Sequence, residues 1–227
     1  MDVGDCLARI AESQIGTRGD LYSGRAALYG YLLATDAKLG AFDPKWTNTG
    51  FGSDRASRYS LLNPGGSDLS SHFRLLDTQN APELPAILRI HSWCAAFVDW
   101  CVMELLTKSP NATSLPLIHR PKTASAFGLL HWGTHSRCCM VVHGHHDTPV
   151  RGDIVVFNFS HTGIVVESGK GHFHSVEGNT TPGTGGNQGY IVDRRLRNQH
   201  LLRGFIRLPP KHRLGDYNIS SGISHTV

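Results

Sequence analysis

The sequence predicts an α+β protein in which helices come first along the chain and a mostly antiparallel sheet follows. Two observations carry this prediction. Apolar residues recur at helical spacing in several segments before residue 135, whereas β-branched runs separated by turn residues dominate from residue 152 onward. The chain has 227 residues, which is long enough to bury a substantial core. We expect one domain over residues 1–210 and a flexible tail over residues 211–227.

The first two predicted helices are packing elements. Apolar residues at helical spacing indicate a helix at residues 5–15 that ends at Gly16, and a second helix at about residues 24–39. Glycine, serine, asparagine, aspartate and proline are then enriched over residues 42–85. We expect a long insertion loop there, which either shapes a substrate site or decorates the surface.

The third predicted helix carries a cysteine in its first turn. Ser92 is a suitable N-cap, the helix continues to about Leu106, and Ser109 and Pro110 stop it. Cys94 then lies where free backbone amides and the helix dipole favour a thiolate. A further short helix is predicted at about residues 122–132.

The strands that follow contain a candidate base, His161, between two β-branched runs. A cysteine on a helix and a histidine on a later strand are the arrangement of papain-like hydrolases. The predicted strands cover about residues 152–159, 161–167, 171–177, 189–194 and 202–207.

A catalytic imidazole needs a third group that holds it in the right tautomer. Because alternate residues of a strand share a face, Glu177 and Asn179 would point the same way. Either could accept from the imidazole of His161. We favour Glu177 as the acceptor, with Asn179 in support; the other interpretation of Asn179 is a turn residue after Gly178.

Other polar residues have simpler interpretations. Cys101 lies two helical turns beyond Cys94 among apolar neighbours and is expected to be a buried, inert thiol. Asp153 is interpreted as a turn residue at the start of a strand. The odd number of cysteines, five, argues against a disulfide framework.

A histidine-rich and cysteine-rich segment at residues 131–146 offers a competing hypothesis, a zinc-binding interaction module on an inactive papain-like scaffold. Adjacent cysteines would strain a shared tetrahedral site, so we predict no metal and no cofactor. The potential ligands are His131, His135, Cys138, Cys139, His143, His145 and His146.

Four motifs in order resemble the CHAP and NlpC-like cysteine amidohydrolases and peptidases. They are Trp93-Cys94-Ala95-Ala96-Phe97-Val98, Gly152-Asp153-Ile154-Val155-Val156-Phe157, His161-Thr162-Gly163-Ile164-Val165 and Glu177-Gly178-Asn179. The resemblance covers about residues 88–180. It implies a papain-like core that cuts an amide bond in the stem peptide of bacterial peptidoglycan through a thioester. It also implies that Cys94 is the nucleophile, that His161 is the base, and that Glu177 and Asn179 complete the site. An acyltransferase use of the same residues, with an amine in place of water, is a weaker alternative.

Charge and the amino terminus bear on partners and location. The net charge of +4 is spread along the chain without a basic stripe, so no nucleic-acid partner is expected, and no apolar run reaches the roughly 18 residues of a membrane span. Residues 1–5 carry acids where a secretory signal would carry basic residues. We therefore expect synthesis in the cytoplasm and action in the periplasm or cell wall of a target bacterium. The routes that fit are a type VI secretion effector, with an immunity protein and a secretion component as partners, and a phage endolysin.

Overall fold

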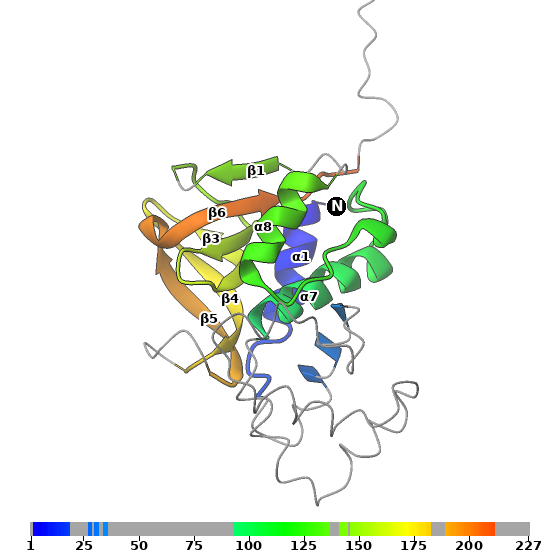
Figure 1. Cartoon of the computed structure of the whole chain (residues 1–227). Helices are drawn as coiled ribbons and strands as arrows, with labels where there is room; N and C mark the ends of the chain where they lie inside the picture. Colours follow the sequence, from blue (N-terminus) through cyan, green and yellow to red (C-terminus); the bar gives the residue numbers. More distant parts are fainter. Residues whose placement is uncertain are drawn as a thin grey trace, which may run out of the picture.

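The structure, a computed structural model, describes residues 2–18, 27, 28, 30, 31, 34, 35, 93–136, 141–144, 146–182 and 189–211. Within these residues, six strands form one antiparallel sheet in the order β1-β6-β2-β3-β4-β5 (Figure 1). The strands are β1 (Val141–Gly144), β2 (Ile154–Phe157), β3 (Thr162–Ser168), β4 (His172–Thr180), β5 (Ile191–Asn198) and β6 (Leu202–Arg207). The helices whose residues are all described are α1 (Val3–Glu12), α7 (Cys94–Lys108) and α8 (Ala126–His135), with short 3-10 turns η1 (Leu117–His119) and η2 (Gln199–Leu201). The predicted α+β class is confirmed.

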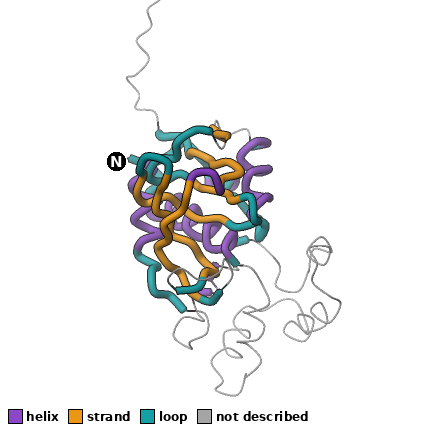
Figure 2. The backbone as a smooth tube through the Cα atoms, turned by 90° about the vertical axis from the view of Figure 1, so that its left-hand side faces the viewer, coloured by secondary structure: helices purple, strands orange, loops and turns teal. Residues whose placement is uncertain are grey.

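The three helices pack against one face of the sheet, and the main hydrophobic core lies between the two layers (Figures 1 and 2). Strand β2 shows how the sheet is buried on both faces. Ile154 and Val156 belong to the main core, whereas Val155 and Phe157 belong to a smaller apolar cluster on the opposite face. This double burial explains why β2 is a continuous apolar run rather than an alternating one.

Helix α7 is buried over most of its circumference, because apolar residues occupy nearly all of its positions. It begins at Cys94 and ends with Ser109 as its C-cap, just before Pro110. The N-cap position is occupied by Trp93, which makes no side-chain capping bond. The prediction of Ser92 as the N-cap is therefore wrong, and Ser92 itself lies outside the described residues.

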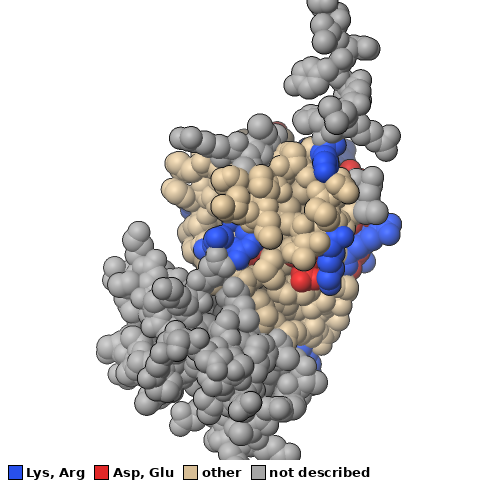
Figure 3. All heavy atoms as spheres, turned by 90° about the vertical axis from the view of Figure 1, so that its right-hand side faces the viewer, with Lys and Arg blue, Asp and Glu red and all other residues tan. Residues whose placement is uncertain are grey.

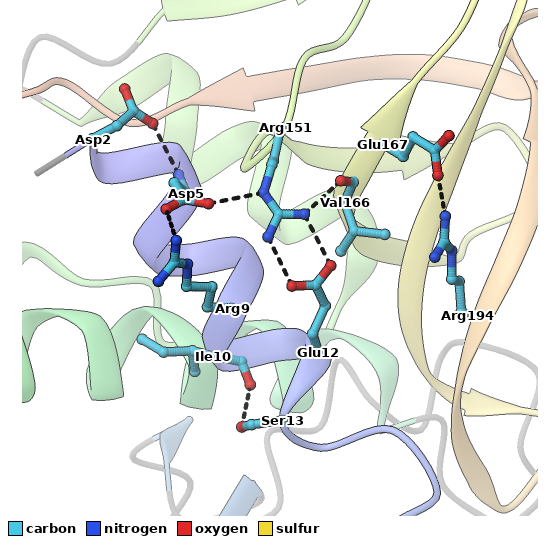
Figure 4. Close-up of polar contacts among 10 residues, drawn as sticks. All are labelled: Asp2, Asp5, Arg9, Ile10, Glu12, Ser13, Arg151, Val166, Glu167 and Arg194. Carbon is cyan, nitrogen blue, oxygen red and sulfur yellow. Dashed lines mark hydrogen bonds and ion pairs between the residues drawn. The ribbon is translucent and has the colours of Figure 1, made fainter.

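Helix α1 is joined to the sheet by Arg151, which precedes β2. Its Nε donates to Oδ1 of Asp5 at 3.1 Å, and its two terminal nitrogens donate to the carboxylate oxygens of Glu12 at 2.9 and 2.7 Å (Figure 4). The adjacent Gly152 has φ of +88°, and a Cβ there would lie 2.1 Å from Cα of Gly4. Because neither Gly4 nor Gly152 has a side chain, α1 can pack closely against the segment before β2.

The boundaries of the elements differ modestly from the predicted ones. The first helix covers residues 3–12 rather than 5–15, and β5 continues to Asn198 rather than stopping at 194. Strand β1 was not predicted. Residues 27, 28, 30, 31 and 34 are helical, in line with the predicted second helix. The predicted insertion at 42–85 and the tail, apart from Lys211, lie outside the described residues.

The charged side chains on the face seen in Figure 3 are scattered, and acidic residues lie beside some of the basic ones. The part of this face drawn in colour shows no continuous basic surface. Across the described ranges, no helix is both long and apolar enough to cross a bilayer.

Candidate active site

Cys94 is the first residue of α7, and only 2% of its surface is exposed. The first backbone bond of the helix runs from the N–H of Phe97 to the carbonyl of Trp93, at 2.9 Å. The N–H groups of Cys94 and the two residues after it therefore have no acceptor within the helix. The thiol lies at the positive end of the helix dipole, beside donors that favour negative charge.

His161 is presented by the tight connection between β2 and β3. The N–H of Phe157 donates to the carbonyl of His161 at 2.9 Å, and Ser160 adopts a left-handed conformation with φ of 59°. The imidazole is 2% exposed and stacks on the rings of Phe157 and Phe159, with centroids 6.0 Å away in each case. Turn and aromatic neighbours together fix the orientation of the ring.

Glu177, in β4, makes the hydrogen bond to the imidazole. Nε2 of His161 lies 2.9 Å from Oε2 of Glu177, and the hydroxyl of Ser175 donates to the other carboxylate oxygen at 2.6 Å. Glu177 is completely buried. Of the two residues that the sequence offered as acceptors for the imidazole, Glu177 is the one that makes this hydrogen bond.

Arg197, in β5, is a member of this cluster that the sequence analysis missed. Its Nε donates to Oε1 of Glu177 at 2.8 Å and its Nη2 to Oε2 at 2.5 Å, which is a two-pronged ion pair. The guanidinium also lies over the rings of Phe157 and Phe159, at 5.2 and 5.5 Å. The available signal was the spacing of Arg195 and Arg197, which puts two arginines on the same face of a strand.

The cluster stabilises the charged forms of its members. Burial would raise the pKa of Glu177, but the hydrogen bonds and charges of Arg197 and His161 lower it to about 2. Burial would lower the pKa of His161, but the charge and hydrogen bond of Cys94, together with those of Glu177, raise it to about 9. Because Nε2 already bonds a carboxylate that can only accept, Nδ1 is the nitrogen left for the thiol of Cys94.

Asn179 lies where β4 departs from regular pairing. The register with β5 shifts between Glu177 and Thr180, and Asn179 has a left-handed φ of 59°. Its side chain is buried, and its carbonyl accepts from the N–H of Gly189 at 2.8 Å. The regular alternation of side chains between the two faces of β4 therefore ends at Glu177. Asn179 lies in the irregular segment that follows, in a left-handed conformation that asparagine adopts more readily than most residues.

Two glycines let the elements of the site approach closely. A Cβ on Gly178 would lie 2.7 Å from both Cβ of Phe97 and Cζ3 of Trp93, so this glycine seats β4 against the first turn of α7. A Cβ on Gly163 would lie 2.7 Å from Cγ of Glu177. The spacing between Cys94, His161 and Glu177 depends on the lack of side chains at these two glycines.

Cys101 and Asp153 have the structural surroundings that the sequence predicted for them. Cys101 is fully buried in α7, and burial raises the pKa of its thiol well above the ordinary value. Asp153 is buried at the start of β2, where it accepts from the N–H of Val150 at 2.7 Å and pairs with Arg207 at 2.9 and 2.7 Å.

The histidine-rich segment is only partly described. His131 and His135 stack on each other with centroids 4.0 Å apart, and His143 stacks on Phe205 at 4.7 Å. Cys138, Cys139 and His145 lie outside the described residues. Among the residues that are described, no three potential ligands converge as a metal site would require.

Comparison with known protein families matches the CHAP domain to residues 89–179. This range contains the helix of Cys94, the strands β1 to β3 and the Glu177-Gly178-Asn179 segment, and it ends before β5 and Arg197. No curated protein matches the chain. The match is to less than half of the chain, and it includes the cysteine, histidine and glutamate that the structure brings together. Residues 89–179 thus resemble CHAP domains, which are generally hydrolases of the amidase or peptidase type that act on peptidoglycan.

Proposed function

We propose that this protein is a cysteine amidase that cuts an amide bond in the stem peptide of bacterial peptidoglycan through a thioester intermediate. One observation carries the proposal. Within the CHAP-type region, the imidazole of His161 interacts with the thiol of Cys94 at the start of α7 and with the buried carboxylate of Glu177. This is the order of nucleophile, base and orienting acceptor that acyl transfer by a thiol requires.

In the first half of the reaction, the thiolate of Cys94 attacks the carbonyl carbon of the amide. The C–N bond breaks as Nδ1 of His161 gives its proton to the leaving amine, and a thioester remains on Cys94. The N–H of Cys94, which has no acceptor within α7, is placed to donate to the developing oxyanion.

In the second half, water attacks the thioester carbonyl. His161 takes a proton from the water, the C–S bond breaks, and the product acid leaves while the thiolate of Cys94 regains its imidazolium partner. Throughout, Glu177 accepts from Nε2 of His161 and so keeps Nδ1 directed at the thiol.

The test is digestion of purified peptidoglycan followed by mass analysis of the released fragments. We expect fragments with a new amine and a new carboxyl group from the wild type, and none from Cys94→Ala or His161→Ala. Cys101→Ala is the matched control, because it removes a second thiol from the same helix and should leave cleavage intact. Equal release by Cys94→Ala and wild type, or no release by wild type, would contradict the proposal.

The biological setting is a second part of the proposal. We propose an antibacterial effector of type VI secretion that works in the periplasm of a target cell and is held in check by an immunity protein, with a phage endolysin as the alternative. Killing of neighbours by a producing strain should then need cell contact and an intact secretion sheath. Killing that is independent of the sheath and accompanies phage release would support the endolysin instead.

A further inference from the structure

The contacts of Glu177 point to a fourth member of the site. Its carboxylate is completely buried and accepts from His161, Ser175 and Arg197. Two of these bonds come from the single guanidinium of Arg197, which is itself buried. Arg197 lies in β5, beyond the CHAP-type region.

The charges of the cluster alternate along the chain of contacts. When the thiolate and imidazolium form, the order is negative Cys94, positive His161, negative Glu177 and positive Arg197, and the sum is zero. Without Arg197, the same state would place an uncompensated negative charge in a buried site, which is strongly unfavourable. Without Arg197, the cluster would therefore hold one more proton than it does with Arg197, and that proton would stay on the thiol of Cys94.

We propose that Arg197 is a positioning residue that balances the charge of Glu177 and fixes its carboxylate, so that Cys94 and His161 can form the reactive thiolate–imidazolium pair. The inference rests on the proposed function for the roles of Cys94 and His161. It extends the site to β5, a strand on the far side of β4 from β3.

Other charged residues of β5 lie near Glu177 in the register of the sheet. Asp193 lies opposite Glu177 in the register of β4 and β5, and its Oδ1 accepts from the N–H of Arg194 at 2.8 Å. Arg195 lies opposite Ser175 and donates to the carbonyl of Thr181. From the helix layer, the ionisable group that interacts with His161 is Cys94. The two-pronged contact distinguishes Arg197 from these neighbours, because it both neutralises and orients Glu177.

The experiment measures the rate at which iodoacetamide alkylates Cys94 in the full-length protein as a function of pH, with the Cys94 peptide quantified by mass spectrometry. Only the thiolate reacts, so the midpoint of the profile reports how readily the pair forms. Arg197→Met should move this midpoint upward by about one pH unit, which is a roughly tenfold change in the equilibrium. Arg197→Lys keeps the charge but loses the two-pronged geometry, and should give a smaller upward shift.

Arg194→Met is the matched control. This substitution removes a positive charge three residues before Arg197 in the same strand. The guanidinium of Arg194 is exposed and pairs with Glu167. Its midpoint should equal that of wild type. In a Glu177→Gln background, adding Arg197→Met should shift the midpoint less than it does in the wild-type background, because the charge to be balanced is gone.

Two results would overturn the inference. One is a lower melting temperature for Arg197→Met with an unchanged midpoint, which would give Arg197 a purely structural role. The other, which applies if Arg197→Met does not fold, is an unchanged midpoint in Arg197→Lys. Alkylation needs no peptidoglycan, so a shifted midpoint in a protein that releases no wall fragments would retain this inference and reject the proposed substrate.

Discussion

Nε2 of His161 and Oε2 of Glu177 are 2.9 Å apart, and both side chains are buried. This contact assigns the imidazole its tautomer, because an ionised carboxylate accepts only and therefore holds the proton of Nε2. The opposite ring nitrogen is then available to the thiol of Cys94, which is where the proposed acyl transfer needs it.

Replacement of Glu177 by glutamine tests this contact. We expect peptidoglycan cleavage to fall by at least about 10²-fold, because a neutral amide neither fixes the tautomer nor stabilises the imidazolium. Stability should fall by about 3–5 kcal/mol, because the buried guanidinium of Arg197 loses the carboxylate that balances its charge. Fragment release and urea unfolding measure the two effects. Glu167→Gln, an exposed carboxylate on β3, is the control and should change neither; a similar loss in that variant would count against the assignment.

The pH dependence of stability should show the same cluster. His161 has a pKa raised from 6.5 to about 9, so its contribution is complete below pH 6.5 and is lost as the pH rises through 9. Glu177 has a pKa lowered from 4.5 to about 2, so its contribution is complete above pH 4.5 and is lost as the pH falls toward 2. The free energy of unfolding, measured in urea from pH 3 to 10, should therefore be highest between 4.5 and 6.5. The double variant His161→Gln, Glu177→Gln should give a flatter curve.

Gly178→Ala should increase the distance between the first turn of α7, which carries Cys94, and β4, which carries Glu177. The added methyl would lie 2.7 Å from atoms of Phe97 and Trp93, so β4 must move away from α7. We expect a stability loss of about 1–3 kcal/mol, as for other overpacked positions, and a larger proportional loss of cleavage. Gly144→Ala is the control, because a Cβ there meets no atom within 4 Å. Full cleavage by Gly178→Ala would show that the spacing is not critical.

Asn179 can be tested for backbone and side-chain roles separately. Its left-handed φ suits glycine, so we expect Asn179→Gly to retain most of the cleavage activity. Asn179→Ala should lose about 1 kcal/mol of stability, because alanine tolerates this conformation poorly. Cleavage assays and thermal melts separate the two effects. A collapse of activity in the glycine variant, at unchanged stability, would instead assign the amide side chain to the reaction.

The contact of Arg151 with α1 is a prediction about stability alone. Hydrogen bonds from Arg151 are the largest influence that lowers the pKa of Asp5 and of Glu12. Arg151→Met should lower the melting temperature by several degrees at neutral pH. The difference from wild type should shrink as the pH falls and both carboxylates become protonated, and also at high salt. A difference that stays constant with pH would show that packing, rather than charge, accounts for it.

The sequence predicted the helix of Cys94, the place of His161 beside a strand and most of the strands, because each depends on local patterns. The apolar run around Cys94 is typical of a buried helix, and the β-branched runs around His161 are typical of strands. The sequence favoured Glu177 over Asn179 without deciding between them, because alternation gives both the same face and the irregular register that separates them depends on pairing with β5.

Arg197 and β1 were missed for different reasons. An arginine in a strand is usually a solvated residue, and its burial here depends on a carboxylate 20 residues earlier in the chain. Strand β1 is short, lies among histidines and cysteines, and is specified by its pairing with β6 at the other end of the sequence. The N-cap of α7 was misassigned by one residue, since chain direction at the helix start depends on the packing of Trp93.

The late position of Arg197 bears on how the protein is made. Cys94 leaves the ribosome about 100 residues before Arg197, which at ordinary rates of translation is on the order of ten seconds. For most of that interval Glu177 and β5 have not been made, so neither the carboxylate nor the guanidinium of the proposed cluster is available. The four side chains can therefore come together only after the last strands have been synthesised.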